Sequence, residues 1–248
     1  MILVVDDFVD SKGSCEAVQA FVKQHNAKVS GPLTACFYLH MCQKISLLEF
    51  GQQEGNIRVK LVAMKESMGT ASVLRHIQKL LVSDFIVMTC DLITNFCLRN
   101  LTDVHCIVDA SCTMLLKRAP PVDPRKKKSK SNAVTQFVGF EKLTCRRNAF
   151  RILYMASELE LGDKLVMPMQ LLARRPNLML DTDLTDVHFY VFSHWVLKIL
   201  EKQPDIDSIR ADLVPYLIRK QLHGLNKFDP DILAKVVRHV NRAHGFVG

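Results

Sequence analysis

The chain has 248 residues, of which 48% are hydrophobic, and its formal net charge is +8 at pH 7. This hydrophobic fraction excludes a disordered tail, and the length suffices for one large domain or two small ones. No apolar run approaches the roughly 20 residues that a membrane-spanning helix needs. Asp6 and Asp7 interrupt the N-terminal apolar run where a secretory signal would need its apolar core, so we expect no export.

The first half of the chain alternates between two patterns. Short apolar runs bounded by polar residues predict strands at 2–5, 57–63, 84–90 and 112–118. Apolar residues at helical spacing predict helices at 14–24, 72–82 and 100–108. Such alternation predicts the α/β fold class, with a mainly parallel sheet and helices on both of its faces.

A basic segment follows, RAPPVDPRKKKSKSN at residues 118 to 132. Its three prolines and its cluster of cations predict an exposed loop and not a packed element. The cations of this basic loop are Arg125, Lys126, Lys127, Lys128 and Lys130. The loop could bind phosphate or an acidic partner, but it contains no aromatic residues that could stack on bases. We therefore favour a solvated loop.

The second half begins with two strand-like runs at 136–142 and 150–156 that predict a hairpin. Residues 165–176 predict a helix with Pro168 in its first turn. The remaining patterns predict extended structure at 178–192 and helices at 193–200 and 208–222.

One strand prediction ends on a carboxylate. In DFIVMTCDLIT, residues 84–94, Asp91 follows the apolar run. Ligands of open α/β sheets bind outside the carboxyl ends of the strands, and a single carboxylate there, with substrate phosphates, can hold magnesium. Gly69 and Thr70 precede the helix at 72–82, where free amide groups could meet a nucleotide. Each signal alone fits a strand cap or a helix cap at least as well.

The other candidate metal-binding or catalytic residues are better explained by structural roles. Asp181 and Asp183 have the spacing of a glycosyltransferase metal motif, but a turn or a strand end explains them better. His188 alternates with apolar neighbours and is interpreted as a packed imidazole, and His239 and His244 as surface residues. The eight cysteines include no CxxC pair, which makes a zinc site improbable. We expect reduced, buried thiols at Cys90, Cys97, Cys106 and Cys112.

The order of these motifs carries a resemblance. The segment from Met68 to Thr94, MGTASVLRHIQKLLVSDFIVMTCDLIT, resembles the core of the nucleotidyltransferase-like fold, in which a GTA loop, a helix and a strand ending in Asp succeed one another. Later segments, above all SIRADLVPYLIRKQ at 208–221, resemble the gamma-subunit family of eukaryotic translation initiation factor 2B. The resemblance covers roughly residues 57–222 and, more loosely, 1–25.

The family implies a non-catalytic assembly subunit of the guanine-nucleotide exchange factor for initiation factor 2. It implies a cytosolic location and partners that include the epsilon subunit and the regulatory core subunits, with no membrane and no direct nucleic-acid contact. By the same resemblance, Gly69, Thr70, Ala71 and Asp91 would be vestigial nucleotide-binding residues, with no cofactor. The alternative is a working sugar-phosphate nucleotidyltransferase, similar to mannose-1-phosphate guanylyltransferases, in which Asp91 holds magnesium.

The chain also departs from the family. Active nucleotidyltransferases grip the triphosphate with a Gly-rich loop, but no GxG occurs here among ten glycines. We expect one partial nucleotidyltransferase-like domain at 1–222, lacking the first strand–helix unit of the fold. Residues 29–54 are interpreted as an atypical insertion within it. The tail at 223–248 is interpreted as divergent, a basic amphipathic helix in place of the family's β-helix.

Overall fold

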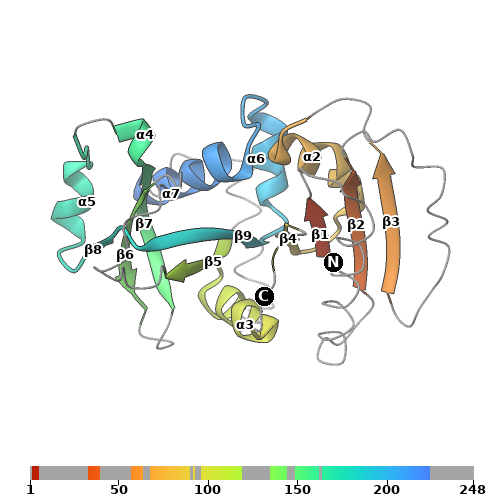
Figure 1. Cartoon of the computed structure of the whole chain (residues 1–248), viewed down its shortest axis with the longest axis horizontal. Helices are drawn as coiled ribbons and strands as arrows, with labels where there is room; N and C mark the ends of the chain where they lie inside the picture. The colour runs from red at the N-terminus through yellow and green to blue at the C-terminus, as the bar shows by residue number, and fades with distance from the viewer. Residues whose placement is uncertain are drawn as a thin grey trace, which may run out of the picture. The chain divides into compact units, whose positions relative to one another are not determined.

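A computed structural model describes residues 2–5, 33–39, 57–63, 68–89, 92, 96–118, 135–143, 149–161 and 164–223 (Figure 1). The chain divides into two compact units. Unit 1 comprises Met1–Leu115, His188–Leu213 and Pro230–Gly248, and unit 2 comprises Leu116–Val187 and Val214–Asp229. Each unit therefore combines segments that are distant in the sequence.

The larger sheet has six strands. They are β1 (Ile2–Val5), β2 (Leu33–Leu39), β3 (Ile57–Ala63), β4 (Phe85–Met88), β5 (Cys112–Arg118) and β9 (Leu184–Phe192), in the order β3-β2-β1-β4-β9-β5. Strand β1 pairs in parallel with both β2 and β4, and β2 pairs in parallel with β3. Strand β9 pairs with β4 in the antiparallel direction. All four residues of β4 are buried, as expected of an inner strand.

The described residues of unit 1 include several helical elements. They are α2 (Thr70–Ile77) with the 3₁₀ turn η2 (Gln78–Leu80), α3 (Leu98–Val108), α6 (Val196–Lys202) and the π-helical turn η3 (Ile209–Leu213). The apolar face of α2 is buried, and α2 packs against α6. The rings of Phe85 and Phe192, on neighbouring strands, lie 5.7 Å apart between centroids. These contacts form the core of the unit.

Unit 2 contains a three-stranded antiparallel sheet in the order β7-β6-β8, made of β6 (Gln136–Lys142), β7 (Phe150–Ser157) and β8 (Met179–Asp181). Its helices are α4 (Glu158–Leu161), α5 (Met169–Arg174) and α7 (Val214–His223). Helix α7 packs against β7. A Cβ atom added at Gly139 would lie 2.9 Å from that of Tyr154, so β6 needs glycine where it approaches β7.

The α/β class is confirmed, and so are several elements. Strands β3 and β5 have the predicted bounds, and β6 and β7 form the predicted hairpin. The segment at 29–54 contributes β2, which fills the position between β1 and β3. No helix among the described residues is long and apolar enough to cross a membrane.

Other bounds were wrong. The helix predicted at 72–82 begins at Thr70 and ends at Ile77, because the chain tightens into a 3₁₀ turn. The helix predicted at 165–176 is only six residues long, and Pro168 is its N-cap and does not lie within its first turn. Pro168 has an extended backbone there, with ψ of 126°. The helix predicted at 14–24 lies outside the described residues.

Candidate functional site

The start of α2 receives a cap from a distant part of the chain. Gly69 is the N-cap residue and has no side chain to cap the helix. The Asp207 carboxylate takes this role: its Oδ1 accepts hydrogen bonds from the Gly69 amide at 3.2 Å and from Ser72 Oγ at 2.6 Å. The Ala71 amide donates to the Asp207 carbonyl at 2.8 Å. Amides at a helix start otherwise lack partners, so Asp207 fills the position that an anion would take.

Thr70 is engaged by the same segment. Its Oγ1 accepts a hydrogen bond from the Ile209 amide at 2.9 Å. A Cβ atom added at Gly69 would lie 2.3 Å from Asp207 Cγ and 2.4 Å from its carbonyl oxygen. Glycine is therefore needed at this position because the turn at Asp207 lies directly against it.

The turn that carries Asp207 is fixed by its own capping contacts. Asp212 Oδ2 accepts from the Ser208 amide at 2.8 Å and from the Asp207 amide at 3.1 Å. Ser208 Oγ in turn accepts from the Ala211 amide at 3.2 Å. This reciprocal pattern resembles a capping box and starts η3. The sequence DSIRAD thus supplies the capping contacts of its own turn.

Arg75 closes the contact between α2 and this turn. Its guanidinium donates to the carbonyl oxygens of Leu200 at 2.7 Å and Ile206 at 2.8 Å, with further bonds to Gln203 and Pro204. A guanidinium offers five N–H donors, so one side chain can satisfy several carbonyl groups at the end of α6. The arrangement is a closed intramolecular lock, which we call the α2 lock: Gly69, Thr70, Ala71, Ser72, Arg75 and Asp207.

The predicted nucleotide-binding residues therefore separate into two groups. The structure brings Gly69, Thr70 and Ala71 together within the α2 lock. Asp91 lies outside the described residues, just beyond the end of β4 at Met88. The basic loop residues 125–130 also lie outside them.

The other carboxylate and histidine candidates have structural surroundings. The Asp183 amide donates to Asp181 Oδ1 at 2.8 Å in the turn between β8 and β9, and Asp181 forms an ion pair with Arg118 at 2.7 Å. These contacts are those of a turn. His188 has a positive φ of 57°, which is uncommon for a residue other than glycine. Its Nε2 lies 3.3 Å from Arg210 Nη1.

A buried polar cluster in unit 1 was missed from the sequence. His105 is only 4% exposed; its Nδ1 lies 2.8 Å from Thr113 Oγ1 and its Nε2 lies 3.3 Å from Ser193 Oγ. Ser193 Oγ donates to the Ala110 carbonyl at 2.7 Å. Because Ser193 is only 2% exposed, its hydroxyl cannot meet a substrate. The sequence of α3 did not predict this cluster, because the residues that bond to His105 come from distant positions, Thr113 and Ser193.

The cysteine interpretation needs a correction. Cys106 is exposed, and Cys97 and Cys112 are partly exposed, all as free thiols, while Cys90 lies outside the described residues. Cys106 follows the buried His105 on α3, so it faces away from the core. Partial desolvation of the sulfur, followed by the charges of Asp84, Asp103 and Asp109, raises the pKa of Cys106. Within the described part of the chain, no three His, Cys, Asp or Glu side chains gather as a metal site.

Comparison with known proteins bears on the site. No protein-family model matches the chain. It is 30% identical over 171 residues to translation initiation factor eIF2B subunit gamma of Schizosaccharomyces pombe. The matched region covers 68% of this chain and 36% of the relative. The resemblance to the eIF2B gamma subunit is confirmed.

Two further gamma subunits agree. The Dictyostelium discoideum protein is 27% identical over 70% of this chain and 42% of its own length. The Caenorhabditis elegans protein is 28% identical over 67% of this chain and 39% of its own length. The chain thus spans about two fifths of the length of the gamma subunits that it matches.

A solved structure supports the fold. UDP-glucose pyrophosphorylase, crystallised with UDP-glucose, superposes with a TM-score of 0.54 over 90% of this chain and 86% of its own chain. The identity is 10%, so the likeness concerns the nucleotidyltransferase-like fold alone.

Proposed function

We propose that this chain acts as a non-catalytic assembly subunit of an initiation factor 2B complex in the cytosol. That complex exchanges GDP for GTP on initiation factor 2. The proposed partners are the epsilon subunit and the regulatory core subunits, and the sequence similarity to gamma subunits supports this role. The proposed domain comprises residues 1–222, with a separate tail at 223–248.

The α2 lock is the observation that carries the non-catalytic part of this proposal. In the predicted nucleotide site, the Gly69 and Ala71 amides already donate to Asp207. A phosphate would have to displace a carboxylate that is also bonded to Ser72, and it would do so beside a like charge. Rate enhancement in phosphoryl transfer depends on positively charged or amide groups aimed at the phosphates. In this chain the Gly69 and Ala71 amides already donate to Asp207 and are therefore not available to a phosphate.

The first experiment tests catalysis. The purified chain should release no pyrophosphate from GTP and mannose 1-phosphate, with or without magnesium. Turnover that requires magnesium and disappears in Asp91→Ala would instead establish the nucleotidyltransferase alternative. Asp207→Ala is an informative companion: it frees the Gly69 amide and the Ser72 hydroxyl, while the Ala71 amide keeps its bond to the backbone carbonyl of residue 207, and we expect no turnover from this variant either.

The second experiment tests assembly. We expect the chain to co-purify with the co-expressed epsilon subunit and to increase nucleotide exchange on initiation factor 2 by the resulting complex. A chain that stays separate from the epsilon and core subunits in size-exclusion chromatography would contradict the assembly role, whatever the outcome of the pyrophosphate assay.

A further inference from the structure

Strand β9 contains a backbone irregularity near its centre. His188 has a φ of 57°, in the left-handed region, and among the described residues only Asp109 is another non-glycine residue with a positive φ. Asp109 is the C-cap of α3, where a left-handed residue is common. His188 lies instead within a strand. A residue with a side chain adopts this conformation at a cost in free energy, so the surrounding structure has to hold it there.

The irregularity lies where β9 leaves its neighbour β4. The ladder between the two strands runs from Phe192, opposite Phe85, to Phe189, opposite Met88. The next residue along β9 is His188, and the chain passes from unit 1 to unit 2 between His188 and residue 187. The first part of β9, residues 184–187, therefore lies beyond the ladder with β4. A change of conformation at His188 can redirect this part and leave the ladder intact.

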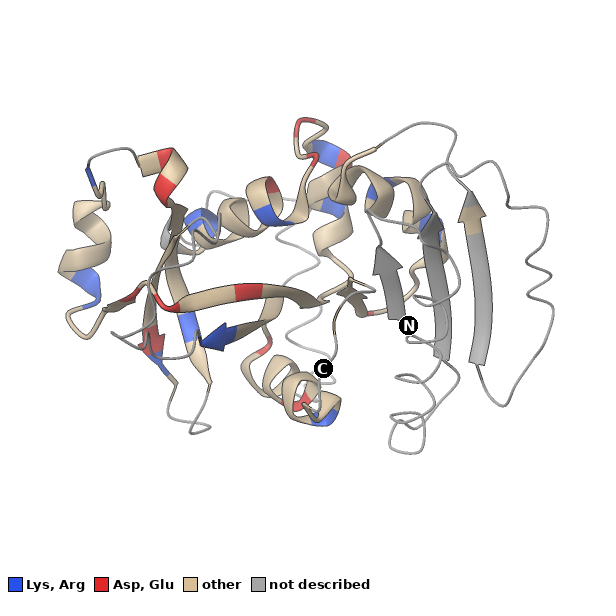
Figure 2. Cartoon of the chain, in the orientation of Figure 1, with Lys and Arg blue, Asp and Glu red and all other residues tan. Residues whose placement is uncertain are grey.

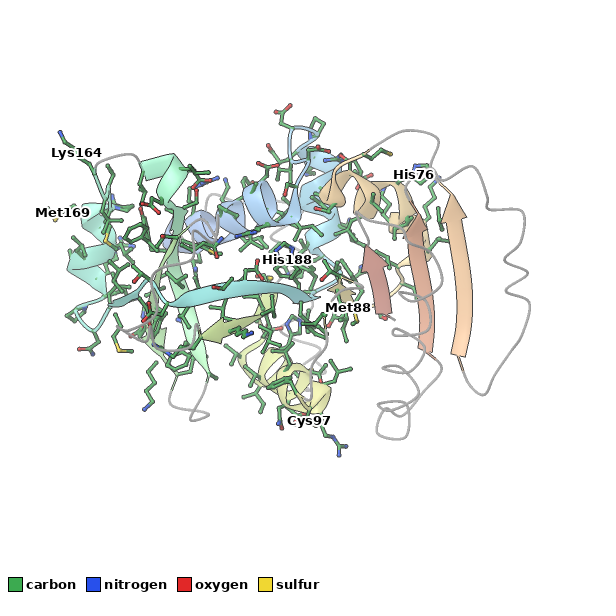
Figure 3. The ribbon with its side chains drawn as sticks, in the orientation of Figure 1. His76, Met88, Cys97, Lys164, Met169 and His188 are labelled. Carbon is green, nitrogen blue, oxygen red and sulfur yellow. The ribbon has the colours of Figure 1, made fainter. Side chains whose placement is uncertain are left out.

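A cation from another element of unit 1 meets His188. Figure 2 shows acidic but no basic side chains along β9, so the cation does not come from the strand itself. It is Arg210 of η3, whose Nη1 lies 3.3 Å from Nε2 of His188, the residue labelled on β9 in Figure 3. A guanidinium can only donate, so Nε2 accepts and the imidazole carries its proton on Nδ1. The contact thus orients the ring of the strained residue.

The turn that carries Arg210 is fixed in place. The neighbouring Ile209 is only 3% exposed, and its amide donates to Thr70 Oγ1 at 2.9 Å. Asp212 accepts from two amides at the start of the same turn. The turn is π-helical, a rare form that occurs mostly as single turns and often at functional positions. A fixed donor therefore faces a strained acceptor.

We propose that His188 is a conformational joint in β9, held in its left-handed state by Arg210. When this contact breaks, His188 relaxes to the extended conformation and residues 184–187 open, while residues 189–192 stay paired with β4. The other explanation for a positive φ in a strand is a static β-bulge, which has no second state. The inference goes beyond the proposed function and does not depend on it, because the joint belongs to the chain alone.

Hydrogen exchange of the whole purified chain tests the joint, with β9 resolved by mass spectrometry. Arg210→Met removes the donor and keeps most of the side chain. We expect the amides of residues 184–188 to exchange about ten-fold faster or more, and those of 189–192 to change by less than about two-fold. Arg210→Lys should recover part of the protection, because an ammonium can also donate to Nε2. The matched control is Arg99→Met, at an exposed position of α3, which should leave β9 unchanged.

Glycine substitutions test the strain separately. Glycine adopts a positive φ without steric cost, so His188→Gly relieves the strain although it removes the imidazole. Exchange at 184–188 should stay within about three-fold of the parent rate, and Arg210→Met should add little in this background. Val187→Gly is the matched control one residue earlier, at a position without a positive φ. Glycine there only weakens the strand and should speed exchange.

His188→Val should have the opposite effect to His188→Gly. A β-branched side chain strongly disfavours a positive φ, so this variant should open residues 184–188 as Arg210→Met does, with 189–192 still protected. If exchange rises equally across 184–192 in His188→Val and in Arg210→Met, His188 is a static bulge and the joint is refuted.

Two further results would show that Arg210 does not hold His188. One is unchanged exchange at 184–188 in Arg210→Met, and the other is an equally large effect of Arg210→Met in the His188→Gly background. Parent-like protection of the α2 amides checks that unit 1 is folded in each variant. If His188→Val does not fold, the Arg210→Met and His188→Gly measurements still decide between the joint and the bulge.

Discussion

Asp207 connects two parts of the sequence at the level of single atoms. It lies 138 residues after Gly69, yet its carboxylate caps the helix that follows that glycine. The cap is electrostatically favourable because the amide end of a helix carries a partial positive charge. One residue thus replaces the local Ser, Thr, Asn or Asp that caps most helices.

Replacing Asp207 with alanine should remove this cap. The Gly69 amide and the Ser72 hydroxyl would lose their acceptor, and we expect the free energy of unfolding to fall by about 1 kcal/mol, the usual effect of losing an N-cap. Urea denaturation monitored by circular dichroism measures the change. Asp205→Ala, an exposed position in the same turn, is the control and should be nearly neutral. Equal effects of the two substitutions would refute the cap.

Cys106 allows a prediction about reactivity. The thiolate is the reactive form, and the raised pKa keeps more of the exposed thiol protonated near pH 8. Iodoacetamide should therefore alkylate Cys106 more slowly in the folded chain than in urea at pH 8, and the difference should narrow as the pH rises above the folded-state pKa. Mass spectrometry of the Cys106 peptide over a pH series measures this. Faster alkylation in the folded chain would contradict the assigned environment.

At the scale of elements, Arg75 joins α2 to the end of α6. It is a partly buried cation whose donors satisfy the Leu200 carbonyl in the last turn of α6 and the Ile206 carbonyl in the segment that follows. The hydrogen bonds of Arg75 add to the packing of α2 against α6. The two helices are distant in the sequence, with 118 residues between Ile77 and Val196. Removal of the guanidinium would leave several of these carbonyls without a donor.

Arg75→Ala should therefore be more harmful than Asp207→Ala. Hydrogen bonds from charged donors contribute about 1.5–3 kcal/mol, so we expect a loss of about 2 kcal/mol in the free energy of unfolding. Arg75→Lys should recover only part of it, because an ammonium is a compact charge and cannot reach several carbonyls at once. Arg99→Ala, at an exposed position of α3, is the control in the same denaturation series. If Arg75→Lys recovered the full free energy of unfolding, the positive charge of Arg75 would matter and its several hydrogen bonds would not.

At the scale of the whole molecule, the net charge of +8 is unevenly distributed along the sequence. The basic loop supplies five cations within residues 125–130. Long-range fields of this kind act mainly on association rates and solubility and little on fold stability.

Replacing Lys126, Lys127 and Lys128 with serine should leave the free energy of unfolding within about 0.5 kcal/mol of the parent value, as for exposed charges in general. Thermal melting measures the stability, and affinity for the epsilon subunit is measured in parallel at low and high salt. If the triple variant loses affinity to the same extent as added salt weakens the parent chain, the loop is an interaction patch and the interpretation as a solvated loop fails.

The fold class, several elements and the family resemblance could be predicted from local sequence patterns. The bounds of strands β3 and β5 and the apolar face of α2 were predicted correctly. They could be predicted because apolar runs and helical periodicity depend on residues that are close in the sequence. The order of GTA, helix and strand carried the resemblance for the same reason: it is a local pattern.

Which distant groups meet could not be predicted from the sequence and depends on long-range packing. The pairing of Asp207 with Gly69, and of His105 with Thr113 and Ser193, depends on how three or four elements pack, and no periodicity encodes it. The exposure of Met169 and Val166 is likewise set by what covers α5, since the same apolar spacing would equally suit a buried helix. Local sequence fixes which faces are apolar, while long-range packing decides which of them are covered and which polar groups find partners.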